Sequence, residues 1–154
     1  MKYLGIDYGS KKVGFAQSDD EGKIAFPLMV SPNDKDLLKD TLELIREMKI
    51  GAIVIGESVD QSGKLNEIAK EARKFAMSLE NAIDVDIYFE KEWFSTVEAR
   101  RQPGKEGKHD VDDQAAAITL QRYLDKINGP SSGEEITYSD EEDLDEVEEG
   151  NGNW

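Results

Sequence analysis

The chain has 154 residues, which is enough for one domain with a hydrophobic core, and it contains no apolar run long enough to span a membrane. It has no cysteine and a single histidine, His109, so disulfides and zinc sites built from thiolates or several histidines are excluded. Any metal must be held by carboxylates, which prefer hard cations such as Mg²⁺ or Mn²⁺. The N-terminal residues lack the pattern of a signal peptide, and we expect a cytoplasmic protein that does not contact membranes.

The negative charge is concentrated at the C-terminal end. Residues 130–154 contain ten Asp and Glu and no Lys or Arg, so that of the net charge of −15 only −5 belongs to residues 1–129. This stretch has no hydrophobic periodicity and too few apolar residues to offset its ordering entropy. We therefore expect one folded domain over residues 1–128 and a disordered acidic tail over residues 129–154. The tail could serve solubility alone, mimic nucleic acid, or bind a basic protein such as a ribosomal protein.

The first part of the chain alternates short apolar stretches with polar turns, and one helical pattern follows. A strand that enters a tight polar turn opens the chain. A stripe of leucines at helical spacing comes next, with Asn33 or Asp34 as its candidate cap and Gly51 at its end. A continuous apolar run then indicates a strand that is covered on both faces. In chain order, we expect strands at residues 2–7, around Val13 and Phe15, and at 24–30, a helix at 37–48 and a strand at 52–56.

The second part alternates helices and strands. Apolar residues recur at helical spacing in two long stretches, and a short strand lies between them. A capping-box pattern starts a short helix, and a loop with two glycines, a proline and four basic residues separates it from the last helix. In chain order, we expect a helix at residues 64–79, a strand at 85–89, a short helix from Ser95, a loop at 100–108 and a helix at 111–127. The order β-β-β-α-β-α-β-α predicts an α/β fold in which helices cover both faces of a mixed five-stranded sheet.

Three acidic residues stand at the ends of these predicted elements. Asp7 ends the first strand, Glu92 follows the fifth, and Asp112 lies in the first turn of the last helix. Each has an ordinary structural explanation, as a turn cap, a loop acid or an acid favoured by the helix dipole. The topology, however, can bring the ends of the first and fifth strands to one crevice, and clustered carboxylates persist when a divalent cation neutralises them. Together the three acids indicate a metal-dependent site for phosphodiester hydrolysis.

Six basic residues could form the phosphate-contacting rim of such a site. Two of them follow the first strand, and four lie in the loop before the last helix. The alternative for each of them is an ordinary solvated position on the surface. The candidates are Lys11, Lys12, Arg100, Arg101, Lys105 and Lys108.

Four segments resemble successive motifs of the YqgF/RuvX family, the Holliday-junction-resolvase-like branch of the ribonuclease H superfamily. They are LGIDYGSKKVGFAQSD, IGAIVIG, STVEA and VDDQAAAITLQRYL, in this order over nearly all of residues 1–128. The resemblance implies a ribonuclease H-like fold and a nuclease that processes the 5′ end of pre-16S rRNA or resolves branched DNA. It also implies that Asp7, Glu92 and Asp112 are the metal-binding acids and that the partner is RNA or branched DNA.

Two positions depart from the family pattern. Lys91 and Trp93 flank Glu92 where the family has an acid and a base, and Glu57 follows the strand that ends at Gly56. We expect Glu57 to add negative charge near the substrate groove. A second hypothesis is therefore a catalytically weak or inactive module that binds nucleic acid or assists ribosome assembly. The first motif also resembles the phosphate loop of actin-like ATPases, but those proteins need two such lobes and this chain can supply one.

Overall fold

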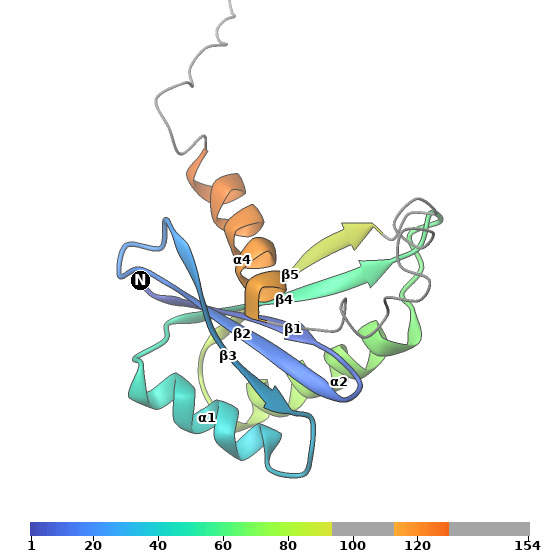
Figure 1. The fold of residues 1–154 in the computed structure, drawn as a ribbon, viewed down its shortest axis with the longest axis horizontal. Helices are drawn as coiled ribbons and strands as arrows, with labels where there is room; N and C mark the ends of the chain where they lie inside the picture. Colours follow the sequence, from blue (N-terminus) through green and yellow to red (C-terminus); the bar gives the residue numbers. More distant parts are fainter. Residues whose placement is uncertain (94–112, 130–154) are drawn as a thin grey trace, which may run out of the picture.

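The computed structural model describes residues 1–93 and 113–129 (Figure 1). Several predicted features lie outside the described residues: the short helix from Ser95, the basic loop at 100–108, Asp112 and the acidic tail from residue 130. The predictions for these segments therefore stay predictions, and the fold is considered for the two described ranges.

Five strands form one mixed sheet. They are β1 (Tyr3–Tyr8), β2 (Lys12–Ser18), β3 (Ala25–Pro32), β4 (Ala52–Val59) and β5 (Asp86–Trp93). Their order across the sheet is β3-β2-β1-β4-β5. The hairpin-linked pairs β1–β2 and β2–β3 are antiparallel, whereas β1–β4 and β4–β5 are parallel. The predicted mixed five-stranded sheet is thus confirmed.

Three described helices cover the two faces of this sheet. The helices α1 (Leu37–Glu47) and α2 (Glu67–Ala82) lie on one face, and α4 (Asp113–Asn128) crosses the other, as Figure 1 shows. The α1/α2 face holds the larger core, in which strand residues such as Ile6, Phe15 and Ile55 pack against both helices. The prediction of helices on both faces is confirmed.

The core under α4 is smaller and is built from smaller side chains. Ala16 and Val54 of the sheet pack there against Ala116, Leu120 and Leu124 of the helix. The helix approaches β1 closely because Gly5 has no side chain: a Cβ at this position would lie 2.8 Å from Leu120 Cβ. The α4 residues of this core form one stripe along the helix, and polar residues occupy neighbouring positions of the helix.

The ends of α1 and α2 differ from the predictions. Asp36, and neither Asn33 nor Asp34, occupies the N-cap of α1, and the Asp36 side chain makes no capping hydrogen bond. The Asp34 carboxylate instead accepts a hydrogen bond from Asp36 N, and the Asn33 amide donates to Gly9 O. The helix α2 begins at Glu67, three residues later than expected, because the Asn66 side chain caps it by accepting a hydrogen bond from Ala69 N.

The C-terminal end of α1 also differs from the prediction. Lys49 (φ 57°), and not Gly51, takes the left-handed conformation after the helix. Gly51 instead donates its backbone N–H to Lys2 O beside the start of β1. The prediction failed because Gly51 directly precedes β4, and its backbone is already paired with the start of the neighbouring strand β1.

The parallel strands β4 and β5 are longer than their apolar runs suggest. β4 continues past Gly56 to Val59, and β5 continues to Trp93, because the parallel pairing extends through Gly56↔Glu90 and Ser58↔Glu92. Glu92 therefore lies within the fifth strand and does not follow it, which corrects the prediction. The described helices include none long and apolar enough to cross a membrane.

Candidate active site

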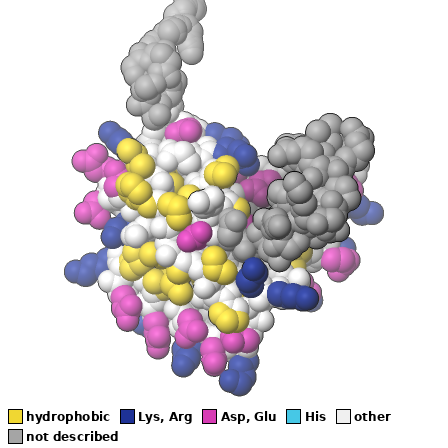
Figure 2. All heavy atoms as spheres, viewed as in Figure 1, with side chains coloured by type: hydrophobic (Ala, Val, Ile, Leu, Met, Phe, Trp, Pro, Cys, Tyr) yellow, Lys and Arg dark blue, Asp and Glu magenta, His cyan; other side chains and the backbone are white. Residues whose placement is uncertain are grey.

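A cleft of about 490 Å³ lies between α4 and β5, and two of the three predicted acids line it. The lining residues are Asp7, Glu90, Lys91, Glu92, Ala115, Ile118, Thr119, Arg122 and Lys126. In Figure 2, acidic side chains lie in the notch beside α4, with basic side chains above them. The third predicted acid, Asp112, lies outside the described residues, three positions before Ala115 of the lining.

Strand register explains why Asp7 and Glu92 line the same cleft. Side chains alternate between the faces of a strand, and Gly5 lies under Leu120 of α4, so Asp7 points to the α4 face as well. Ile6 pairs with Ile55 of β4 and Gly56 pairs with Glu90 of β5. Asp7, Gly56 and Glu90 therefore share one row of the sheet, and Glu92 stands one step further along the same face.

Gly56 leaves the space that the Glu92 carboxylate fills. A Cβ at position 56 would lie 3.3 Å from Glu92 Oε2 and 3.3 Å from Thr119 Cγ2. A side chain in the middle of this row would therefore make the carboxylate shift by a few tenths of an ångström, so the glycine helps to define the site.

Two residues of α4 contact the Glu92 carboxylate. The Thr119 hydroxyl donates a hydrogen bond to Glu92 Oε2, and Arg122 Nη1 lies 3.8 Å from the same oxygen. Thr119 is buried, whereas the Glu92 side chain remains 30% exposed. Glu92 is thus held from the helix side and open toward the cleft.

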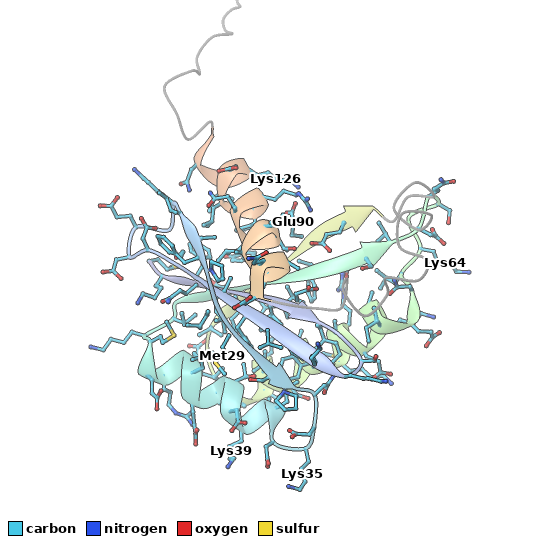
Figure 3. All side chains as sticks on the ribbon, viewed as in Figure 1. Met29, Lys35, Lys39, Lys64, Glu90 and Lys126 are labelled. Carbon is cyan, nitrogen blue, oxygen red and sulfur yellow. The ribbon has the colours of Figure 1, made fainter. Side chains whose placement is uncertain are left out.

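A second glutamate, Glu90, lies deeper in the cleft and is neutralised. Its side chain is 3% exposed, and Lys126 Nζ lies 2.7 Å from Glu90 Oε2 (Figure 3). Burial raises the pKa of the neighbouring Tyr123, and the charges of Tyr88, Tyr3 and Glu90 raise it further. The Tyr123 ring also stacks on Tyr88, with ring centroids 5.4 Å apart. This end of the cleft is therefore a packed, charge-balanced structure.

The sequence did not lead us to Glu90, Thr119, Arg122 or Lys126. Their spacing along β5 and α4 could have indicated them. Glu90 and Glu92 are two residues apart, which is the spacing of one strand face. Thr119, Arg122 and Lys126 are three and four residues apart, which is the spacing of one helix face. The predicted fifth strand, however, ended at residue 89, where its apolar residues end, so Glu90 and Glu92 were not assigned to one strand face.

The predicted basic rim stays a prediction. Lys11 in the turn after β1 and Lys12 at the start of β2 are exposed, and neither lines the cleft. Four further candidates lie outside the described residues: Arg100, Arg101, Lys105 and Lys108. Within the described ranges, the cations at the cleft come from β5 and α4 and are Lys91, Arg122 and Lys126.

The expectation that Glu57 adds charge near the groove is wrong. Glu57 is buried on the opposite face of the sheet, where Arg73 Nε of α2 donates a hydrogen bond to Glu57 Oε2. The Arg73 guanidinium also lies 3.9 Å from the centre of the Phe89 ring. β4 continues beyond Gly56, so alternation turns residue 57 away from the face that bears Asp7.

The donor chemistry of the cleft fits a hard divalent cation. Asp7 and Glu92 offer carboxylate oxygens, the ligands that Mg²⁺ and Mn²⁺ prefer. Within residues 1–93 and 113–129, no group of three or more acidic or histidine side chains is arranged to hold a metal. A complete set of three acids would require Asp112, which lies outside these ranges.

Comparison with known proteins identifies the family. Residues 1–126 match the RuvX family, described as Holliday junction resolvase. A protein of Maridesulfovibrio salexigens named "Putative pre-16S rRNA nuclease" is 35% identical over 132 residues, which cover 80% of this chain and 98% of the relative. A protein of the same name from Sulfurihydrogenibium sp. is 35% identical over 144 residues, which cover 90% of this chain and 98% of that relative.

Solved structures with the same fold are more distant in sequence. The RuvC protein of T. thermophilus in complex with a Holliday junction substrate has a TM-score of 0.53 and 17% identity, covering 84% of this chain and 97% of that chain. A second Thermus thermophilus RuvC structure has a TM-score of 0.52 and 18% identity, with the same coverage. These likenesses confirm the ribonuclease H-like fold. From the family match and the relatives together, the chain belongs to the RuvX family.

Proposed function

We propose that this protein is a divalent-metal-dependent nuclease that hydrolyses phosphodiester bonds. Asp7, Glu92 and Asp112 are its metal-binding acids, and Mg²⁺ or Mn²⁺ is its cofactor. The observation that carries the proposal is that Asp7 of β1 and Glu92 of β5 line one cleft, beside the α4 residue Ala115. A divalent cation bound there supplies Lewis acidity at the phosphate and activates water for attack on phosphorus.

The described residues around these acids have distinct tasks in this proposal. Thr119 fixes the Glu92 carboxylate through its hydroxyl, so that the ligand is oriented before a cation arrives. Lys126 neutralises Glu90, so this buried carboxylate adds no net charge beside the metal ligands. The negative charge that attracts a cation is thereby concentrated on Asp7 and Glu92.

The names of the relatives and of the family support the proposed substrate class. Two relatives that match nearly over their whole length carry a name referring to pre-16S rRNA, and the family description refers to Holliday junctions. We therefore take 5′-end processing of pre-16S rRNA as the reaction and cleavage of branched DNA as the alternative. Both substrates present a phosphodiester backbone to the same cleft.

One observation favours a second candidate, a binding module without catalysis. The guanidinium of Arg122 lies 3.8 Å from Glu92 Oε2, so its positive charge competes with a cation for the Glu92 carboxylate. Calorimetric titration of the full chain with Mn²⁺ discriminates the two functions. Absence of a site at millimolar metal, together with retained RNA binding, would support the binding module.

Cleavage by an Asp7→Asn variant tests the nuclease proposal. An RNA containing the 5′ precursor sequence of 16S rRNA is incubated with full-length protein and Mg²⁺ or Mn²⁺. We expect Asp7→Asn to lower the cleavage rate by more than about 100-fold, because a neutral amide is a poor ligand for a hard cation. Asp84→Asn, which changes an exposed acid outside the cleft, is the matched control. Equal rates for the two variants would contradict the proposal.

A further inference from the structure

We propose that Arg122 is a phosphate-binding residue of the cleft, which pairs with Glu92 in the free protein and exchanges it for the nucleic-acid backbone. The inference rests on the proposed function, because it assumes that nucleic acid enters this cleft. It names a residue outside the basic rim that the sequence predicted.

Two ion pairs join α4 to β5, and they differ in how easily they separate. Lys126 Nζ lies 2.7 Å from Glu90 Oε2, and the Glu90 side chain is 3% exposed. Removing Lys126 from this partner would leave a buried carboxylate without a counter-charge, which is costly. Lys126 is therefore committed to Glu90.

Arg122 is held much less firmly. Its Nη1 lies 3.8 Å from Glu92 Oε2, which is too long for a hydrogen bond. The Arg122 and Glu92 side chains are 47% and 30% exposed, and ion pairs between partly exposed groups contribute little stability. Separation of this pair also leaves Glu92 with a partner, because the Thr119 hydroxyl donates to the same oxygen.

The chemistry of Arg122 suits a phosphate. A guanidinium carries five N–H donors in a planar fork that binds phosphate oxygens in pairs. At 3.8 Å these donors are not satisfied by Glu92, and Arg122 lines the same cleft as Asp7. A phosphate near the two acids would therefore find its counter-charge on the adjoining helix face.

The exchange also couples cation binding to substrate binding. In the free protein, the Glu92 charge attracts Arg122 away from an incoming phosphate. Neutralising Glu92, either with a cation or by substitution with Gln, removes that attraction. The affinity for nucleic acid should rise as a result, and the rise should depend on Arg122.

The test measures nucleic-acid affinity in EDTA, where cleavage does not contribute. Full-length wild type, Arg122→Gln, Glu92→Gln and the double variant are titrated against a fluorescein-labelled four-way DNA junction and an RNA hairpin. Fluorescence anisotropy is recorded at several salt concentrations between about 50 and 200 mM. Arg46→Gln, on the exposed surface of α1, is the matched control for the loss of one arginine.

We expect Arg122→Gln to weaken binding on the order of 10-fold at low salt and to reduce the salt slope for the junction by about 0.9, the value for one phosphate contact. Glu92→Gln should tighten binding, and Arg122→Gln should still weaken it in the Glu92→Gln background. If Arg122→Gln has no effect in that background, Arg122 only offsets the repulsion between the Glu92 charge and the nucleic-acid backbone. That result overturns the proposal.

Other outcomes separate this inference from the proposed function. An effect of Arg122→Gln no larger than that of Arg46→Gln overturns the inference, even if wild type cleaves RNA. Wild type that binds in an Arg122-dependent manner but never cleaves supports the inference and removes the nuclease function. Wild type that binds neither probe at low salt overturns both.

Discussion

The two faces of the sheet carry the same pair of residue types in opposite settings. On the α2 face, the buried carboxylate of Glu57 accepts a hydrogen bond from Arg73, and the guanidinium also covers the Phe89 ring. On the α4 face, Glu92 lies 3.8 Å from Arg122 at a cleft of about 490 Å³. A glutamate beside a helix arginine is therefore structural when its carboxylate is buried, as in Glu57, and available to a ligand when its carboxylate is partly exposed, as in Glu92. Accessibility distinguishes the two, because the residue types are the same.

The difference arises from the size of the surrounding side chains. The α1/α2 face is filled by large residues such as Phe15, Ile55 and Phe75. The α4 face is filled by Ala16, Val54 and three helix residues, and this filling stops before the row that contains Gly56. Beyond that point the space between the helix and the sheet remains as a cleft, which is lined mostly by polar and charged side chains.

The largest expected effect contrasts the two glutamates directly. We expect Glu92→Gln to lower metal-dependent cleavage by more than about 100-fold, because it removes the charge of a proposed metal ligand. We expect Glu57→Gln to leave the rate within about 2-fold at a temperature where the protein is folded, because the Glu57 carboxylate lies on the opposite face of the sheet and does not line the cleft. Steady-state cleavage of a 16S rRNA precursor by both variants provides the measurement. Similar losses in the two variants would remove the distinction between the faces.

The second effect concerns stability. Arg73→Met leaves buried Glu57 without a cation and removes the contact with Phe89, so we expect the free energy of unfolding to fall by about 2 kcal/mol. This value is reduced from that of a fully buried pair because the Arg73 side chain is half-exposed. Arg122→Met should cost no more than about 0.5 kcal/mol. Urea unfolding followed by circular dichroism gives both values, and an equal cost for the two variants would show that the open pair is structural after all.

The third effect concerns the orientation of Glu92. Thr119→Val keeps the shape of the side chain but removes the hydroxyl that donates to Glu92. We expect the Mg²⁺ concentration for half-maximal cleavage to rise about 10-fold, the size usual for partners of metal ligands. Thr119→Ser, which retains the hydroxyl, should restore a value close to that of wild type. Failure of the serine variant to do so would indicate that packing against Gly56, and not the hydrogen bond, governs the site.

The smallest effect concerns the space beside Glu92. In Gly56→Ala, the new Cβ would lie 3.3 Å from Glu92 Oε2 and Thr119 Cγ2, so the carboxylate must move by a few tenths of an ångström. We expect a loss of cleavage of about 3-fold, because small displacements of positioned groups lower the rate. The melting temperature should change little. An unchanged rate would mean that Glu92 tolerates this displacement.

The sequence predicted the fold better than the site, for identifiable physical reasons. Alternation and helical spacing located every strand and described helix, and the polar end of the first strand located Asp7 at the cleft. The predicted strands ended where apolar residues ended, whereas β4 and β5 continue through backbone pairing. Glu92 was therefore expected after its strand, and Glu57 was expected on the wrong face.

The partners of Glu92 required knowledge of tertiary contacts. Helical spacing predicts the apolar stripe of α4, which includes Ala116, Leu120 and Leu124. It does not say which strand the adjoining polar stripe faces. That Thr119 and Arg122 face β5 depends on the sheet order and on how closely α4 approaches Gly5.

A diffraction experiment tests the central claim most directly. Crystals of the full-length protein grown with Mn²⁺ give anomalous difference density that locates the ion. We predict a peak in the cleft between α4 and β5, within bonding distance of carboxylate oxygens of both Asp7 and Glu92, with Arg122 turned away from Glu92. A map with Mn²⁺ peaks elsewhere on the protein and none at these two residues would contradict the account.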